Sequence, residues 1–414
     1  MSDEADRGVQ TARQPSHHEV AAAVRATYAA FIGAGFVVAS FASRIPQVRD
    51  RLHLSPSELG LVLLAAAVGS LTALPLGGAI IGRLGARRTV ASMVLVAAFG
   101  VATIAVGYLV GVVPVLVGLF LLGFGNGAWD VAMNVHGADV ERHLSRAIMP
   151  KFHAGFSVGT VAGALLGAAM VAVGLSVTVH LLVAAVLVAA VLPVWVQRFL
   201  PDRAPAAGPD GAATTSRRSP LARWREPRTL LVGLVVLAFA FAEGAGSDWI
   251  NVSMIDGYGA PAAVGGLGFA TFLAAMTAAR WFGSQLLDRY GRVTVVRSLA
   301  VVAVLGVLVF VFGPTLPVAF VGVALWGAGT SLGFPVGMSA ASDDPDAAAG
   351  RVSVVASIGY FAFLGGPPLV GFLGDHVTVL RALLAVAVLL AVAVTITPAM
   401  RPLPQDGVPG PADA

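Results

Sequence analysis

The feature that most limits what this chain can fold into is a series of long apolar runs. Each is close to the roughly 20 residues that cross a ~30 Å hydrocarbon core as an α-helix. Only 12% of the residues are charged, against about a quarter in ordinary soluble domains. Too little polar surface is therefore available to face water, and the chain is predicted to be an all-α membrane protein.

Hydropathy windows of about 19 residues predict twelve transmembrane helices, six on each side of a polar segment. The predicted helices cover residues 23–43, 57–80, 89–111, 113–136, 153–174, 177–197, 229–250, 263–287, 294–313, 316–338, 351–373 and 378–398. The polar segment is rich in Pro, Gly, Ser and Arg, which is typical of a flexible linker. The expected organisation is a tail over 1–22, a bundle over 23–198, a linker over 199–228, a second bundle over 229–400 and a tail over 401–414.

The basic residues predict the orientation of these helices. Most of the 26 Lys and Arg fall in the loops and tails of one side. The exceptions are Arg44, Arg49, Arg51 and Arg381 on the other side, and Arg280 inside a helix. Loops rich in Lys and Arg stay in the cytoplasm, so both termini and the linker are expected to be cytoplasmic. The net charge of +4 is explained in this way, without nucleic acid as a partner.

The two predicted bundles resemble each other. Gly118, Gly123 and Gly125 recur 204 residues later as Gly322, Gly327 and Gly329. A loop with the pattern Gly-x4-Arg83-x-Gly85-x-Arg87-Arg88 follows the second helix, and Asp288-Arg289-x-Gly291-Arg292 follows the eighth, 206 residues later. Six helices per copy keep both copies in the same orientation, so the sequence predicts two parallel, pseudo-symmetric six-helix halves with a cleft between them.

These features together resemble the major facilitator superfamily. The segments LGFGNGAWDVAMNVHGADVE, KFHAGFSVG and GSDWI are similar to the bacterial group around the MosC and YbjJ membrane proteins. The resemblance implies a secondary transporter in the cytoplasmic (inner) membrane of a bacterium, working by alternating access. It also implies a small-molecule substrate, the lipid bilayer as surroundings, a monomer, and no cofactor or metal.

The resemblance assigns a gating role to the loop residues. Arg83, Gly85, Arg87 and Arg88 in the first half, and Asp288, Arg289, Gly291 and Arg292 in the second, are expected to lock the cytoplasmic side of the outward-open state; the alternative is that they only set topology. Two residues depart from the family pattern. Gly82 replaces the usual aspartate, and Leu119 replaces an arginine that many proton-coupled members carry.

Charged groups inside the predicted spans are the main site candidates, because lipid stabilises them poorly. They are Asp130, Glu243, Asp248 and Arg280. Asn126, Asp130 and Asn134 share one helix face, as do Glu243, Ser247 and Asn251. We expect both faces to meet the substrate in a water-filled cleft; the alternative for the asparagines is hydrogen bonding between helices.

Further roles remain open for several of these residues. Asp130 and Glu243 are the leading candidates for contact with protons or substrate. A hydrogen-bonding role between helices is the alternative for Glu243, and Asp248 is equally consistent with a solvated rim. Arg280 lies at the same depth as Asp130, which suggests an ion pair; otherwise Arg280 reaches the cytoplasmic surface or pairs with Asp288. Trp129 and Trp249 are candidates for stacking on a ligand or for packing only.

The sequence excludes several other functions. The chain has no cysteine, and its spans contain no HExxH motif, P-loop or Ser/His/Asp set, which argues against an enzyme or an ATP-driven pump. The favoured function is proton-coupled transport of a small solute. The alternatives are an uncoupled facilitator of the same fold and a transporter-like membrane receptor or sensor.

Overall fold

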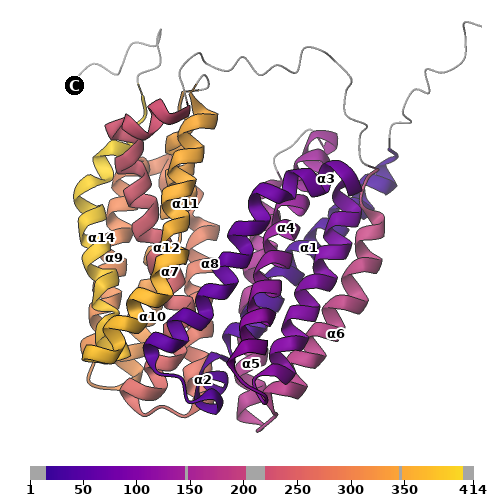
Figure 1. Cartoon of the computed structure of the whole chain (residues 1–414). Helices are drawn as coiled ribbons and strands as arrows, with labels where there is room; N and C mark the ends of the chain where they lie inside the picture. Colours follow the sequence, from indigo (N-terminus) through magenta and orange to yellow (C-terminus); the bar gives the residue numbers. More distant parts are fainter. Residues whose placement is uncertain (1–14, 145–147, 202–219, 345–346, 404–414) are drawn as a thin grey trace, which may run out of the picture.

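The computed structural model describes residues 15–144, 148–201, 220–344 and 347–403. Within them the chain is helical, and Figure 1 shows two bundles side by side. The first bundle contains α1 (His17–Ala42), α2 (Ile45–Leu52), α3 (Pro56–Gly107), α4 (Val112–Leu144), α5 (Met149–Ala172), α6 (Val177–Trp195) and η1 (Val196–Arg198). The second contains η2 (Pro220–Arg225), α7 (Pro227–Tyr258), α8 (Ala262–Tyr290), α9 (Arg292–Phe312), α10 (Leu316–Thr330), α11 (Gly333–Ala341), α12 (Ala348–Val377), α13 (Val379–Ala382), α14 (Leu384–Ile396) and η3 (Thr397–Met400).

These helices supply the twelve predicted membrane crossings. α3 has 52 residues, which at 1.5 Å per residue would be about 78 Å long if it were straight. Gly85, with φ 78° and ψ 163°, divides it into two crossings. Gly291 has nearly the same conformation, φ 73° and ψ 154°, and separates α8 from α9. Both turns need a positive φ, which glycine adopts without steric cost.

The ends of the predicted segments differ from the observed ones. α1 was predicted to begin at residue 23 but begins at His17. The earlier start is explained by a capping box that Ser16 and Glu19 form at its N-terminus. The last part of the predicted linker forms η2 and the first turn of α7. Residues 202–219 of the predicted linker lie outside the described residues, as do residues 1–14 and 404–414 of the two tails.

The internal repeat reappears in the packing of the helices. A methyl group added at Gly123 would lie 2.0 Å from the carbonyl oxygen of Ala66, and one at Gly327 would lie 2.3 Å from that of Phe272. Ala66 and Phe272 are themselves 206 residues apart. Gly125 against Ala97 and Gly329 against Ala303 form a second matched set of close contacts. The glycines allow the same close approach of helices in both bundles, which confirms the predicted pseudo-symmetric halves.

The two halves are joined on one side of the molecule. We name this side the α2 face, and the other, where α1 begins at His17 and η3 ends at Met400, the terminal face. On the α2 face Gly60 packs against the backbone of Pro367, and Gly371 against that of Pro56. Hydrogen bonds that join the halves through Arg49, Ser57 and Asn251 also lie on the α2 face. Figure 1 shows the bundles meeting near α2.

Candidate functional site

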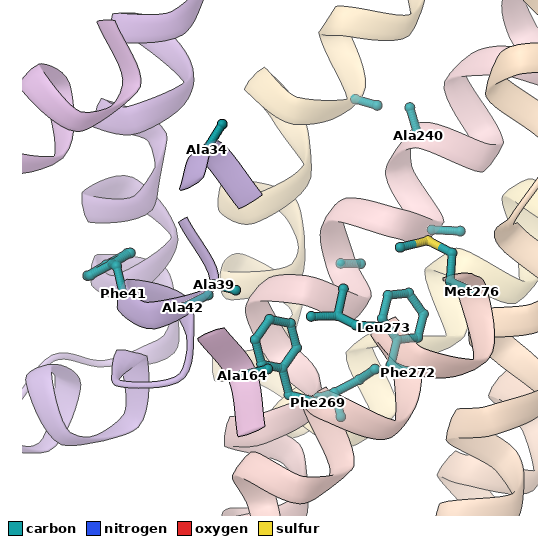
Figure 2. Packing of buried hydrophobic residues seen from close by; sticks show 14 of the residues in the cluster. Ala34, Ala39, Phe41, Ala42, Ala164, Ala240, Phe269, Phe272, Leu273 and Met276 are labelled. Atoms are coloured by element: carbon teal, nitrogen blue, oxygen red, sulfur yellow. The ribbon is translucent and has the colours of Figure 1, made fainter. Parts of the chain in front are cut away.

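A cavity of about 430 Å³ lies between the two halves. Its walls come from α1, α2, α3, α4 and α5 of the first half and from α7, α8 and α12 of the second. Most of the lining is apolar. Figure 2 shows part of this wall, with Phe269, Leu273 and Met276 of α8 beside Ala39 and Ala42 of α1.

The charged centre of the cavity is an ion pair between neighbouring helices of the second half. Arg280 of α8 donates from Nη2 to Oε2 of Glu243 on α7 over 2.9 Å, and from Nε to the carbonyl oxygen of Ser331 over 2.9 Å. The suggested pair between Arg280 and Asp130 is therefore wrong. Arg280 binds a carboxylate of its own half, because α7 and α8 are in direct contact.

Asp248 is the second carboxylate on the cavity wall. It lies on α7 five residues beyond Glu243, about 8 Å further toward the α2 face at 1.5 Å per residue. Within the described residues no hydrogen bond or ion pair reaches its carboxylate. The cavity thus holds one carboxylate that Arg280 neutralises and one, Asp248, that has no partner among the residues that the structure describes.

Uncharged polar groups complete the lining. Asn126 of α4 and Ser247 of α7, both predicted, face the cavity. Tyr360 of α12 also lines it. The sequence interpretation did not include Tyr360, although a phenolic group inside an apolar span was a usable signal. The other missed lining residues include Ser70, Ser157, Thr160, Phe41, Phe156 and Phe363.

Five residues predicted to meet the substrate lie outside the cavity lining: Asp130, Asn134, Trp129, Trp249 and Asn251. Asp130 accepts hydrogen bonds from the Asn134 amide, which is 3.2 Å from its Oδ1 and 2.8 Å from its backbone carbonyl oxygen. Asn134 therefore bonds within its own helix. Trp129 and Trp249 are completely buried and contribute to packing. The stripe of Asn126, Asp130 and Asn134 extends about 12 Å along the axis of α4, and only Asn126, at the end nearer the α2 face, lines the cavity.

On the α2 face the cavity is closed by polar contacts between the halves. Arg49 of α2 makes a two-pronged ion pair with Asp256 of α7, with Nη2 to Oδ1 at 2.9 Å. Asn251, predicted to share the substrate-facing stripe of α7, instead donates to the carbonyl oxygen of Ser43 over 3.1 Å. Asp375 accepts from the backbone N–H of Ser57 over 3.3 Å. Two of these contacts involve α7 and the third involves α12, and together the three hold the α2 face shut.

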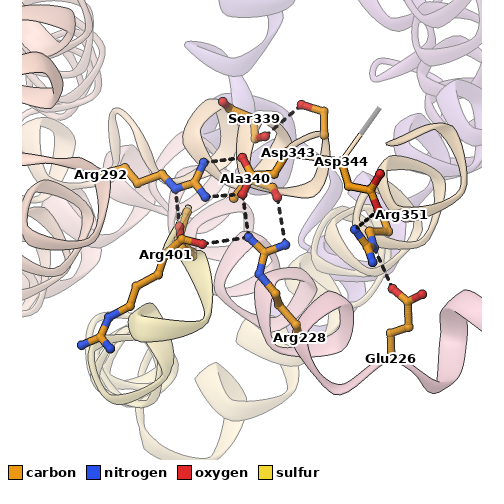
Figure 3. Close-up of polar contacts among 11 residues, drawn as sticks. Glu226, Arg228, Arg292, Ser339, Ala340, Asp343, Asp344, Arg351 and Arg401 are labelled. Atoms are coloured by element: carbon orange, nitrogen blue, oxygen red, sulfur yellow. Dashed lines mark hydrogen bonds and ion pairs between the residues drawn. The ribbon is translucent and has the colours of Figure 1, made fainter. Parts of the chain in front are cut away.

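On the terminal face the second half forms a cluster of charges, which Figure 3 shows. Asp343 accepts from Nη1 of Arg292 over 2.7 Å and from Nη2 of Arg228 over 2.7 Å. Burial would raise the pKa of Asp343, but the two arginines outweigh it and lower that pKa. Burial would also raise the pKa of Glu226, but hydrogen bonds to Arg351, Arg223 and Thr229 outweigh it and lower that pKa to about 2. We name this set the terminal cluster; it consists of Arg223, Glu226, Arg228, Thr229, Arg292, Asp343 and Arg351.

The predicted gating residues of the two loops differ in their contacts. Arg292 belongs to the terminal cluster, whereas Arg83 and Arg88 are exposed and Arg87 is half-buried. No hydrogen bond or ion pair joins the guanidinium group of Arg83, Arg87 or Arg88 to another described residue. Arg289 lies over the ring of Tyr290, and Asp288 has no ion pair within the described part of the chain.

Comparison with known proteins identifies the family. Residues 27–362 match the Major Facilitator Superfamily. The chain belongs to this family. An uncharacterized transporter of Sinorhizobium fredii, y4wD, is 33% identical over 384 residues, which are 91% of this chain and 98% of that protein. The membrane protein MosC of Rhizobium meliloti is 28% identical over 365 residues, 87% of this chain and 86% of MosC.

Solved structures confirm the fold of this superfamily member. The nucleoside transporter NupG, in the form of a point mutant, superposes with a TM-score of 0.77 at 13% identity, over 92% of this chain and 99% of NupG. The fucose:proton symporter FucP of E. coli, also as a point mutant, gives 0.61 at 17% identity, over 92% and 99%. The protein is thus a multi-pass membrane transporter and not an enzyme, and the resemblance to the superfamily and to MosC is confirmed.

Proposed function

We propose that the protein is a secondary active transporter that moves a small solute across the bacterial cytoplasmic membrane by alternating access, coupled to protons. Both termini lie in the cytoplasm and the working unit is a monomer. The observation that carries this proposal is the cavity between the halves, closed on the α2 face, with the Glu243–Arg280 pair on its wall. With the terminal face in the cytoplasm, this is the inward-facing arrangement.

The ion pair supports a role in coupling. Protonation of Glu243 would remove its charge and release Arg280, whose nearest remaining partner is the carbonyl oxygen of Ser331. Rearrangement of a charged side chain between α7 and α8 then couples proton binding to the packing of the second half. Glu243 is favoured over Asp130 as the proton carrier, because Asp130 lies outside the cavity lining.

The same pair also fits an uncoupled facilitator. A carboxylate neutralised by an arginine can stay ionised through a whole transport cycle, and the pair would then serve solute binding alone. The two functions differ in one measurable property, which is the response of flux to a pH gradient.

The experiment begins with a thermal-shift screen of purified protein against nucleosides, sugars, amino acids and organic amines, since a ligand of the folded state raises its stability. A compound that binds is then used in proteoliposomes with and without an imposed pH gradient. We expect the gradient to drive its flux, and Glu243→Gln to abolish that drive. Asp130→Asn should impair it less. Flux that ignores the gradient selects the facilitator, and gradient-driven flux that survives Glu243→Gln rules out coupling through this residue.

A further inference from the structure

We propose that the cavity recognises a monovalent organic cation with an apolar or aromatic body, and that Asp248 is the residue that binds its charge. This inference rests on the proposed transport function, which it narrows to a class of solute. It follows from the charge balance of the cavity, the composition of its walls and its size.

The charge balance favours a cation. Three charged side chains line the cavity: Glu243, Asp248 and Arg280. Glu243 and Arg280 neutralise each other at 2.9 Å, so Asp248 leaves a net charge of about −1 when it is ionised. An ionised carboxylate facing apolar walls is costly without a counter-charge. A bound monocation supplies that charge, whereas a dication would leave an excess.

The same arrangement disfavours an anion. Arg280 already donates to Glu243 and to the carbonyl oxygen of Ser331. An anionic solute would have to displace Glu243 from Arg280, and would leave that carboxylate and Asp248 without partners in the same small volume. Two unpaired carboxylates in one apolar cavity repel each other and the solute.

The walls indicate the rest of the solute. Aromatic rings from both halves surround the space: Phe41 and Phe156 from the first half, and Phe269, Tyr360 and Phe363 from the second. Such rings bury an apolar body and attract a cation to their faces. A volume of about 430 Å³ is within the range of about 300–1,000 Å³ of ligand pockets. It suits a single amine that carries one ring or a short alkyl chain.

Asp248 lies close, along α7, to the contacts that close the α2 face. It lies on the α2-face side of the Glu243–Arg280 pair, on the same helix as Asp256 and Asn251, which hold the α2 face shut. A cation that binds Asp248 therefore reaches the part of α7 that must move when the α2 face opens.

The test uses three probes with one body and different charge: 3-phenylpropylamine, 3-phenylpropanol and 3-phenylpropanoate. Binding to the purified full-length protein is measured by thermal shift and by calorimetry at pH 7. We expect the amine to bind at least tenfold more tightly than the alcohol or the acid. Asp248→Asn should reduce that preference at least tenfold, and Asp248→Glu should retain it. Glu19→Gln, which removes a carboxylate at the exposed start of α1, is the matched control and should bind like wild type.

Several results would overturn the inference: equal binding of the three probes, preference for the acid, no binding of the amine at millimolar concentration, or an amine preference that survives Asp248→Asn with the protein folded. The proposed transport function is tested separately by flux. Preferential binding of the amine without flux of any ligand would keep the cation site and refute transport. Flux of a neutral or anionic solute that is independent of Asp248 would keep transport and refute the cation site.

Discussion

The two halves share a backbone design but contribute different chemistry to the cavity. Matched glycines bring equivalent helices together in both, and Gly85 and Gly291 make nearly identical turns. Yet the three charged side chains on the cavity wall, Glu243, Asp248 and Arg280, all come from the second half. The first half supplies amide, hydroxyl and apolar groups, such as Asn126, Ser70 and Phe156.

The terminal face repeats this asymmetry. Arg292 of the second loop is bonded to Asp343, while the guanidinium groups of Arg83, Arg87 and Arg88 in the first loop make no bond to other described residues. Fold symmetry and chemical symmetry are therefore separate properties of this chain. The repeat determines where helices pack closely. Individual side chains determine which half carries the charged groups of the cavity.

The largest effect that tests this comparison is expected from Arg280→Met. The substitution leaves Glu243 without a partner inside the span. Breaking a fully buried pair costs about 3–5 kcal/mol, and since the side chains of Arg280 and Glu243 are 29% and 26% exposed, we expect about 1–3 kcal/mol here. The melting temperature in detergent should fall, and transport should be lost.

The double variant Glu243→Gln/Arg280→Met separates stability from function. It removes both charges, so its melting temperature should return toward that of wild type while transport stays absent. Arg225→Met, an exposed arginine in η2, is the control and should leave both properties unchanged. A double variant as unstable as Arg280→Met would show that the pair is not the source of the loss.

The next largest effect is on folding stability, and it concerns how the contribution of the terminal cluster depends on pH. The pKa values of Asp343 and Glu226 are lower in the folded protein than their usual values, with Glu226 at about 2. A lowered carboxyl pKa stabilises the fold above the unfolded pKa of about 4, and this contribution is lost as the pH falls through the folded value. Arg292 bonds Asp343, so Arg292→Gln should cost about 1–2 kcal/mol at pH 7, and this cost should shrink as the pH falls below about 4 and the Asp343 carboxylate becomes protonated.

Arg88→Gln in the first half is the matched variant. It removes an exposed arginine after an equivalent glycine turn, but one whose guanidinium has no bonded partner among the described residues. Its melting temperature should stay close to that of wild type, within the roughly 0.5 kcal/mol typical of surface substitutions. Equal losses in Arg88→Gln and Arg292→Gln would contradict the asymmetry of the two loops.

Most of the fold could be predicted from the sequence, because the cost of exposing backbone and charge to lipid constrains every span. The apolar runs predict the twelve crossings, and the glycine spacing predicts the paired halves. The start of α1 was missed because Ser16 and Glu19 cap a polar first turn that hydropathy ignores.

The site could be predicted only in part. Glu243, Asp248 and Arg280, which line the cavity, were candidates from the sequence because charged groups in a span are rare. The partner of Arg280 was not found, since depth along a helix says nothing about which neighbour it faces. Trp129 and Trp249 show the same limit: their positions beside polar stripes suggested a ligand, but rotation about the helix axis buries both in the packing.

The smallest expected effect concerns the ion pair between the halves on the α2 face. Arg49 and Asp256 form a partly exposed pair, with side chains 12% and 41% exposed, and such pairs contribute up to about 1 kcal/mol. Asp256→Asn should therefore shift the population toward an open α2 face by up to about fivefold, while the Asn251–Ser43 and Asp375–Ser57 contacts remain.

The chain has no cysteine, so spin labels can be attached to Arg51→Cys and Arg381→Cys, exposed positions of the two halves on this face. The distance distribution between the labels should gain a longer component in Asp256→Asn. Asp50→Asn is the matched control, because Asp50 also bonds Arg49 but belongs to the same half. It should leave the distribution unchanged. A longer component of equal size in both variants would mean that the charge of Arg49, rather than its bond across the halves, holds the α2 face closed.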